Sequence, residues 1–243
     1  LDLIQKKYDV VAVVTRPDKP QGRSLKLSPP PVKSALHELG ISIDIYQPDK
    51  ASTQEFAEIL SKYKPDLFLV LAYGEIIKDF ILKIPSKTCI NIHASLLPKY
   101  RGAAPIQRCI MDGESKTGIT IIEMVAKMDA GAMIAARSVS ISSEDSFIDV
   151  EAKLLSACDV LVPDVLDRFD DLFSIKQAQD ESKVTFAPKI MPEDLIIDWN
   201  KSAGVIHNQV RALSPVPCAY LNIEYQGQIK RLKVRRSQVL TDI

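Results

Sequence analysis

The feature that most constrains the fold is a series of short strand-like segments that alternate with amphipathic ones. The strand-like segments occupy residues 8–15, 41–46, 65–73, 88–94, 117–125 and 132–141. Residues 31–40 and 52–63 lie between them and have helical spacing. Strands connected through helices, several of them apolar on both faces, are typical of a parallel sheet covered on both sides. We therefore predict an α/β domain with a mostly parallel, doubly wound sheet.

The pattern of the chain changes after about residue 180. Before that point, residues 145–169 have the apolar spacing of a helix, which Pro163 should kink or split. Residues 202–213 form a second predicted helix, and from Ser214 the pattern alternates as in antiparallel strands, with a turn at Gln226–Gly227. We expect an N-terminal domain at 1–182, a linker with a helix at 183–213, and the beginning of a small β domain at 214–243.

Both ends of the sequence suggest that further segments complete the fold. The first residues, LDLIQKKYD, have no initiating methionine and have the pattern of a helix end that leads into a strand. Two or three strands do not form a stable sheet on their own. We expect a strand before Leu1 and a continuation of the β domain after Ile243.

Composition argues against a metal centre, a disulfide framework and a membrane span. The four cysteines are far apart and form no Cys-x-x-Cys pattern, which favours a reducing compartment. The three histidines are also scattered, and we expect His37 and His207 to be structural or surface residues. No apolar run approaches the ~20 residues of a membrane-spanning helix. We therefore expect a cytoplasmic protein without metal, with an organellar matrix as the alternative.

The segment NIHASLLPKYRGAAP, residues 91–105, places reactive groups at a strand end. Alternation puts Asn91 and His93 on one face, at the edge where open α/β sheets bind ligands, and Asp129 follows in an Asp-Ala-Gly loop. In acyl transfer an amide can stabilise an oxyanion, an imidazole can move protons, and a carboxylate can orient the imidazole or a water. Alternatively, His93 is a core histidine bonded to a backbone carbonyl, Asn91 caps the strand, and Asp129 is an ordinary turn residue.

The same stretch resembles the signature of the folate-dependent formyltransferases. It contains Asn-x-His, Ser-Leu-Leu-Pro and an aromatic-Arg-Gly sequence, and MDAG at 128–131 matches the Asp-x-Gly of that family. The resemblance covers essentially the whole chain. It implies a Rossmann-like formyltransferase domain, the start of a small OB-like β barrel, and Asn91, His93 and Asp129 as catalytic residues. Because histidine titrates near neutral pH, the active protonation state of His93 stays open.

The resemblance also implies a binding site for 10-formyltetrahydrofolate, the formyl donor, and no metal. The Ser-Leu-Leu-Pro stretch matches the tetrahydrofolate-binding stretch of the family, and two loops match those around the pterin ring. The residues carried over are Ser95, Leu96, Leu97, Pro98, Tyr73, Gly74, Glu75, Ile76, Ile77, Val125, Ala126, Lys127 and Met128.

Two basic segments bear on the identity of the formyl acceptor, which the resemblance implies is a tRNA. In residues 15–33, Lys and Arg outnumber acidic residues five to one, and the prolines and glycine argue against regular structure. This loop resembles the one that contacts the acceptor end of initiator tRNA in one branch of the family. Residues 230–236, KRLKVRR, would place a stripe of cations on one strand face; a solvated loop and a charged edge strand are the alternatives. The expected tRNA contacts are Arg16, Lys19, Arg23, Lys26, Lys33, Lys230, Arg231, Lys233 and Arg235.

By this resemblance the protein transfers a formyl group from 10-formyltetrahydrofolate to the α-amino group of methionine on initiator methionyl-tRNA, acting as a monomer. Asn91 and His93 would stabilise the tetrahedral intermediate, and Asp129 would orient His93 and a water. A sugar-amine or purine-pathway formyltransferase and a catalytically silent tRNA-binding module are alternatives. So is a dinucleotide-binding oxidoreductase, although no Gly-x-Gly-x-x-Gly follows a predicted strand.

We expect Arg23→Ala to weaken the use of initiator tRNA, because Arg23 is expected to contact phosphate groups. The KM for tRNA should rise and should depend less on salt, whereas the affinity for a folate analogue should not change. Steady-state kinetics at several salt concentrations and a folate-binding titration measure both. A loss of folate affinity instead would show that the loop has another role.

Overall fold

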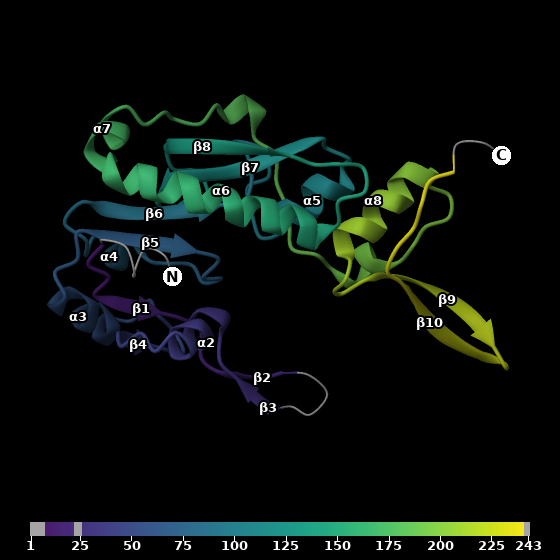
Figure 1. Ribbon diagram of the computed structural model, residues 1–243, viewed down its shortest axis with the longest axis horizontal. Coiled ribbons are helices and arrows are strands. Elements are labelled where there is room, and N and C mark those ends of the chain that lie inside the picture. The colour runs from purple at the N-terminus through teal and green to yellow at the C-terminus, as the bar shows by residue number, and fades with distance from the viewer. Residues whose placement is uncertain (1–7, 22–25, 241–243) are drawn as a thin grey trace. The chain divides into compact units, whose positions relative to one another are not determined.

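The computed structural model describes residues 8–21 and 26–240 (Figure 1). These residues form two compact units, the first comprising 8–21, 26–91 and 123–126 and the second comprising 92–122 and 127–240. The boundary falls within strand β6 (Thr88–His93).

Parallel pairing is present in the first unit, as the sequence predicts. Strands β1 (Ala12–Val14) and β4 (Asp44–Tyr46) run parallel, with Ala12 opposite Asp44 and Val14 opposite Tyr46. Strand β5 (Leu67–Leu71) follows later in the same unit. Each strand comes after or before a helix, which is the connection that parallel strands require.

Two helices of the first unit have start signals in the sequence, and a third is short. Helix α2 (Pro31–Glu38) begins with a proline, whose missing N–H costs nothing at that position. At the start of α3 (Gln54–Lys62), the side chain of Thr53 accepts the N–H of Phe56 at 3.2 Å. Helix α4 (Asp79–Leu82) is a single turn. The core of this unit consists of Ala51, Phe56, Ala57, Leu60 and Ile81.

Residues 15–33 are not an irregular loop throughout, so this prediction is wrong for two short segments. Strands β2 (Lys19–Gln21) and β3 (Lys26–Ser28) form an antiparallel pair, with Pro20 opposite Leu27. A proline is tolerated here because each strand of a two-stranded ribbon has one edge without a partner strand, so a missing N–H need not break a ladder.

The second unit is built on an antiparallel pair with helices packed against it. Strands β7 (Lys116–Glu123, its last residue assigned to the first unit) and β8 (Met133–Ser140) pair antiparallel with a register shift at Ile121/Ile122. Helix α6 (Phe147–Asp167) packs along β8, and α5 (Pro105–Met111) packs against α8 (Ala203–Leu213). Figure 1 shows α6 running alongside β8. Fully buried residues of this unit include Ile110, Ile119, Ile121, Val150 and Val165.

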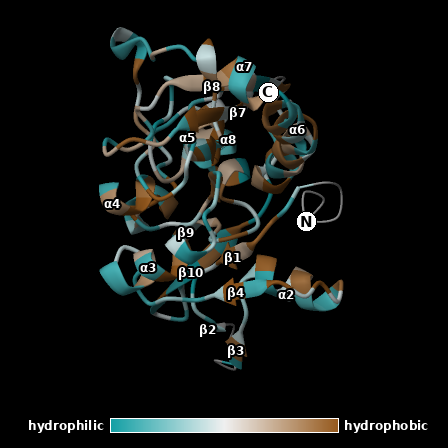
Figure 2. Cartoon of the chain, turned by 90° about the vertical axis from the view of Figure 1, so that its left-hand side faces the viewer, coloured by the Kyte–Doolittle hydropathy of each residue, from teal (hydrophilic) through white to brown (hydrophobic). Residues whose placement is uncertain are grey.

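Helix α6 continues through Pro163, so the predicted split at this residue is wrong. The helix begins at Phe147, after the N-cap residue Ser146, which forms a capping box with Asp149, and α7 (Phe169–Ser174) starts only after Asp167. In Figure 2, α6 carries both hydrophilic and hydrophobic residues. Val162 and Val165 are buried on either side of the proline. Tertiary packing of this apolar face therefore outweighs the local cost of a proline.

The end of the chain forms the predicted hairpin. Strands β9 (Ala219–Tyr225) and β10 (Gln228–Val234) pair antiparallel, and the turn residues Gln226 and Gly227 have φ values of 53° and 69°, as in a type I′ turn. Ala219, opposite Val234, joins the apolar cluster of Ile197, Val210 and Leu213. The short helices η1 (Glu181–Lys183) and η2 (Pro192–Leu195) precede α8.

An ion pair attaches η2 to α5. Arg108 Nη1 and Nη2 donate to the two carboxylate oxygens of Asp194 at 2.9 and 2.6 Å. These hydrogen bonds are the main reason why the pKa of Asp194 lies below its ordinary value. A lowered pKa means that the folded state binds the proton less readily than the unfolded state does. The pair therefore stabilises the fold above the pKa of an unfolded aspartate, and this stabilisation is lost as the pH falls through the folded value.

We expect Asp194→Asn to cost about 1–3 kcal/mol of unfolding free energy at pH 7, since Arg108 loses a charged acceptor. The difference from the unmodified chain should shrink as the pH falls below about 4, where an unfolded aspartate becomes protonated. Urea unfolding at pH 7 and at pH 3 measures this. A difference that is independent of pH would contradict the assignment.

Candidate active site

Strand β6 carries the first two predicted catalytic residues at its end. Asn91 and His93 lie two positions apart in the strand, so they share a face and their Cα atoms are about 6.6 Å apart along it. Asn91 is half-buried, and His93 is buried with 5% of its surface exposed. The strand then ends, and residues 94–100 turn away from it.

The imidazole of His93 is held between a carbonyl and a carboxylate. Nε2 lies 2.8 Å from the backbone oxygen of Tyr100. Because a carbonyl can only accept, Nε2 carries a hydrogen and donates it. Nδ1 faces Asp129, with 3.6 Å between Nδ1 and Oδ2. The ring therefore has one nitrogen committed to the backbone and one directed at the carboxylate.

Asp129 occupies a strained turn with its side chain anchored. It has φ of +50°, in the left-handed region that non-glycine residues seldom adopt. Its carboxylate oxygen Oδ2 accepts the N–H of Gly102 at 2.9 Å, and its side chain is 12% exposed. The oxygen that faces His93 is thus the one that the Gly102 amide fixes.

The structure therefore brings His93 and Asp129 together and puts Asn91 on the same strand face as His93. The carbonyl contact of Nε2 is the one expected of a core histidine, but a core role does not require a carboxylate opposite Nδ1. With 6% of its side chain exposed, the imidazole has little contact with solvent.

Tyr100, which sequence reasoning did not single out, provides the carbonyl that holds His93. Its backbone is left-handed with φ of 63°, and its N–H donates to Thr185 Oγ1 at 2.9 Å. Its hydroxyl donates to Asp112 at 2.9 Å. Burial, followed by this hydrogen bond, raises the pKa of the Tyr100 phenol far above its ordinary value. The ring therefore stays neutral and anchors the turn.

The predicted folate stretch Ser95–Pro98 is a tightly bonded loop. Ser95 is fully buried, and its hydroxyl donates to the Lys99 carbonyl at 2.6 Å. Thr120 of β7 donates to the Ser95 carbonyl at 2.7 Å and accepts the N–H of Leu97 at 3.2 Å. Leu96 lies directly over Gly118, where an added Cβ would come within 2.5 Å of it. These contacts give Ser95, Leu96 and Leu97 internal roles in shaping the loop.

The predicted pterin loops present apolar side chains to solvent. In residues 73–77 of the first unit, Ile76 is 72% exposed, and the buried Tyr73 hydroxyl has no hydrogen-bond partner within the described residues. Glu75 is held by the Ala51 N–H and by Arg16. In the second loop, Val125 and Met128 are exposed. The remaining predicted residues of these loops are Gly74, Ile77, Ala126 and Lys127, of which Ile77 packs against the core of the first unit.

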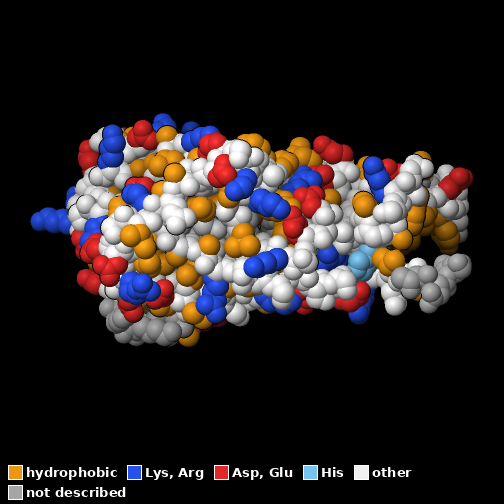
Figure 3. All heavy atoms as spheres, turned by 90° about the horizontal axis from the view of Figure 1, so that it is seen from above, with side chains coloured by type: hydrophobic (Ala, Val, Ile, Leu, Met, Phe, Trp, Pro, Cys, Tyr) orange, Lys and Arg blue, Asp and Glu red, His pale blue; other side chains and the backbone are white. Residues whose placement is uncertain are grey.

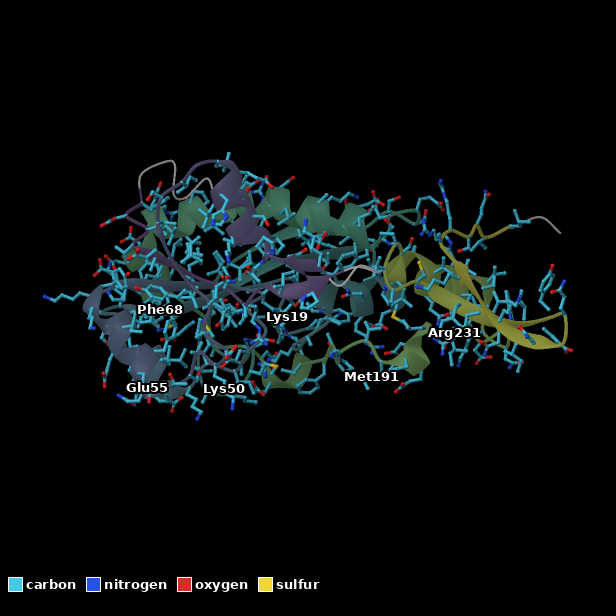
Figure 4. All side chains as sticks on the ribbon, turned by 90° about the horizontal axis from the view of Figure 1, so that it is seen from below. Lys19, Lys50, Glu55, Phe68, Met191 and Arg231 are labelled. Carbon is cyan, nitrogen blue, oxygen red and sulfur yellow. The ribbon has the colours of Figure 1, made fainter. Side chains whose placement is uncertain are left out.

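Two of the predicted tRNA contacts near the N-terminus are engaged within the protein. Arg16 pairs with Glu75 at 3.2 Å, and Lys33 bonds both carboxylate oxygens of Asp18 at 2.9 Å. Lys19 and Lys26, on β2 and β3, are exposed, and Figure 4 labels Lys19. Arg23 lies outside the described residues.

The predicted contacts on β10 are exposed, and two of them stack on tyrosine rings. Lys230 lies over the ring of Tyr225 and Arg231 over that of Tyr220, with the cations 4.6 and 4.7 Å from the ring centroids. Figure 4 shows Arg231 on this hairpin. Lys233 donates to the Pro217 carbonyl at 3.0 Å, and Arg235 follows the strand.

Basic side chains are not confined to these two segments. On the face shown in Figure 3, Lys and Arg are interspersed with Asp and Glu, in keeping with the zero net charge of the chain. His37 is exposed, whereas His207 is buried and lies 3.0 Å from both Ser143 O and Ser237 Oγ. Both fit the predicted surface and structural roles.

Within the described residues, no three or more His, Cys, Asp or Glu side chains are grouped so that they could hold a metal ion. In the same part of the chain no helix combines the length and apolar character needed to span a membrane.

Sequence reasoning also missed Gln179, which contacts the loop of Asp129. Its side chain donates to the carbonyls of Asp129 and Gly131 at 2.7 and 2.8 Å. Gln179 follows Asp129 by 50 positions in a segment without regular structure, so no periodicity marks it. Only the tertiary fold brings the two together.

Comparison with known proteins identifies the family. The family model described as Formyl transferase matches residues 2–166, and that described as Formyl transferase, C-terminal domain matches residues 189–242. Methionyl-tRNA formyltransferase from Protochlamydia amoebophila (strain UWE25) is 47% identical over 238 residues, which are 98% of this chain and 74% of the relative. The chain belongs to the methionyl-tRNA formyltransferase family. It is therefore an enzyme of the transferase class, and the predicted family is confirmed.

Solved structures share the fold at lower sequence identity. A 4-N formyltransferase from Francisella tularensis is 20% identical with a TM-score of 0.71, covering 98% of this chain and 92% of that chain. HypX from Aquifex aeolicus in complex with tetrahydrofolic acid is also 20% identical, with a TM-score of 0.63 over 80% of this chain and 33% of that chain. The family match confirms the predicted Rossmann-like formyltransferase domain followed by antiparallel strands.

We expect Gly102→Ala to impair the formyltransferase by displacing the anchor of Asp129. Gly102 has φ of +127°, and an added Cβ would lie 2.6 Å from the Ala187 carbonyl oxygen, so the backbone must move. A displacement of about 1 Å can cost about 100-fold in rate. Formyl-transfer kinetics measure the loss. Gly204→Ala is the control, because its added Cβ meets nothing within 4 Å; equal activity of both variants would contradict the expectation.

Proposed function

We propose that this enzyme transfers the formyl group of 10-formyltetrahydrofolate to the α-amino group of methionine on initiator methionyl-tRNA, using Asn91, His93 and Asp129. The observation that carries the proposal is the pair of His93 and Asp129 at 3.6 Å, with the carboxylate fixed by the Gly102 amide. The family membership supports the acceptor, since its members are named for methionyl-tRNA.

The reaction needs charge stabilisation and two proton movements. The amine nitrogen forms a bond to the formyl carbon, and the bond between that carbon and N10 of the folate then breaks. The amine loses a proton and N10 gains one. The formyl oxygen becomes negatively charged in between, so donors preorganised around it lower the barrier.

His93 can contribute through Nδ1, because Nε2 is already committed to the Tyr100 carbonyl. When protonated, Nδ1 is a donor for the developing oxyanion or for a water beside Asp129. Asp129 keeps the imidazole oriented and can accept from that water. The fixed carbonyl on one side and the fixed carboxylate on the other preorganise the ring before substrate binds.

Asn91 would supply a neutral donor to the same oxyanion. Its place on the face of β6 that carries His93 supports this role. Removing one such donor typically costs about 2.7–4 kcal/mol of activation free energy.

Each predicted pterin loop, taken by itself, offers contacts that suit a planar ring with a polar edge. Exposed Ile76, Val125 and Met128 offer apolar contacts, and the unpaired buried hydroxyl of Tyr73 offers a hydrogen bond. Ligand pockets combine apolar lining with a few such polar groups. When bound, the folate supplies an activated formyl group.

Exposed cations support a polyanionic acceptor. Lys19, Lys26, Lys230, Arg231 and Arg235 have exposed side chains. Arg16 and Lys33 are engaged with Glu75 and Asp18, so we assign them to shaping the loop before any phosphate contact. Phosphate contacts make binding dependent on salt.

The acceptor is tested by offering charged initiator tRNA and small amines, including sugar amines, to the same enzyme with 10-formyltetrahydrofolate. We expect formylation of the charged tRNA at a kcat/KM at least about 100-fold above that of any small amine. Preference for a small amine would overturn the acceptor assignment and leave the formyl-transfer chemistry in place.

We expect His93→Ala and Asp129→Ala to lower kcat by about 10²–10⁴-fold, the usual contribution of a general acid–base group. Binding of tRNA, measured by filter binding, should change little because neither side chain belongs to the basic segments. His37→Ala is the matched control, since His37 is exposed on α2. Near-normal turnover by the His93 variant would instead support the core-histidine interpretation.

A further inference from the structure

We propose that Gln179 is a positioning residue that holds the turn of Asp129 in the conformation that directs the carboxylate at His93. This inference rests on the proposed function, because it assigns Gln179 a role through Asp129 and not through contact with substrate. The turn and Gln179 both belong to the second unit.

The turn of Asp129 does not have the sequence that its conformation favours. The Ala130 N–H bonds the Lys127 carbonyl at 3.2 Å, which closes a β-turn with Asp129 as its third residue. With φ of +50° at that position, such a turn prefers Gly or Asn. Contacts from outside the turn must therefore offset the local cost.

Gln179 supplies those contacts with both of its amide hydrogens. Nε2 donates to the Asp129 carbonyl at 2.7 Å and to the Gly131 carbonyl at 2.8 Å. The two carbonyls flank Ala130 and converge on one nitrogen, which fixes the curvature of the loop. Gln179 is 9% exposed, so little competing water reaches these bonds.

Arg101 fixes which way the amide points. Its Nε and Nη2 donate to Gln179 Oε1 at 3.0 and 2.8 Å. Because a guanidinium has no acceptor, Oε1 must face Arg101 and Nε2 must face the loop. Arg101 is 2% exposed, and its Nη1 is buried without a hydrogen-bond partner within the described residues. Nη2 also donates to Glu181 Oε1 at 2.8 Å, so Gln179 and Glu181 together pair the guanidinium, and Arg101 in turn orients the Gln179 amide.

Both attachments of Asp129 lead to the same short segment. The carboxylate bonds the Gly102 amide, and the backbone is linked through Gln179 to Arg101, the preceding residue. The Tyr100 carbonyl that holds His93 belongs to this segment too. Residues 100–102 thus set the positions of both reactive side chains, and Gln179 completes the link.

Gln179→Glu tests the proposal with little change of volume. A carboxylate still accepts from Arg101, which keeps the buried guanidinium paired, but it cannot donate to the two loop carbonyls and faces them with lone pairs. We expect kcat to fall about 10–100-fold, with the KM for charged tRNA and the Kd for tetrahydrofolate within threefold of the unmodified enzyme. Gln179→Met, which removes the amide without adding charge, should show the same separation of kcat from KM.

Asp194→Asn is the matched control for lost stability, because it removes a charged hydrogen-bond acceptor elsewhere in the same unit. Its kcat should stay within twofold even where its thermal unfolding midpoint falls as much as that of the Gln179 variants. A kcat of Gln179→Glu and Gln179→Met within twofold of the unmodified enzyme would overturn the proposal.

A double-mutant cycle with Asp129→Asn separates positioning from general damage, measured under single turnover. If Gln179 acts through Asp129, Gln179→Glu should lower the rate of Asp129→Asn by less than twofold. Losses that multiply would overturn the positioning role. Full activity of Asp129→Asn by itself would count against the proposed function, which keeps the two failures distinct.

Discussion

The functional interpretation depends on one oxygen atom, Oδ2 of Asp129. It accepts the Gly102 amide and faces Nδ1 of His93, so this backbone N–H holds the carboxylate oxygen that the imidazole faces. The other ring nitrogen is fixed by the Tyr100 carbonyl. The backbone of residues 100–102 thus holds both His93 and Asp129. In the proposed mechanism such a fixed pair would need little reorganisation during the reaction, which is the condition under which electrostatic stabilisation is most effective.

The parts of the site that are local in sequence were predictable from it. Asn91 and His93 share a face because strand geometry has a period of two, and the Gln226–Gly227 hairpin follows from residues that accept positive φ. Asp129 was identified by its Asp-x-Gly motif. Its strained conformation and its anchor at Gly102 were not predictable, because both depend on a loop that the fold brings in from elsewhere.

The errors of sequence reasoning have the same origin. Local rules predict that Pro163 breaks the helix, but the buried side chains of Val162 and Val165 keep α6 intact. Arg16 and Lys33 count as free charges in the sequence, but Glu75 and Asp18 pair with them once the first unit folds. Composition marks residues 15–33 as basic, but it does not distinguish cations that pair within the unit, such as Arg16 and Lys33, from exposed ones, such as Lys19 and Lys26.

Thr120 of β7 holds the loop that follows His93. Its hydroxyl, buried in β7, donates to the Ser95 carbonyl and accepts the Leu97 N–H. The adjacent positions in the strand are Ile119 and Ile121, whose side chains have no polar atom. A register shift of β7 by one residue would therefore leave both the Ser95 carbonyl and the Leu97 N–H without their hydrogen-bond partner. The register of β7 and the shape of the loop after His93 therefore depend on each other.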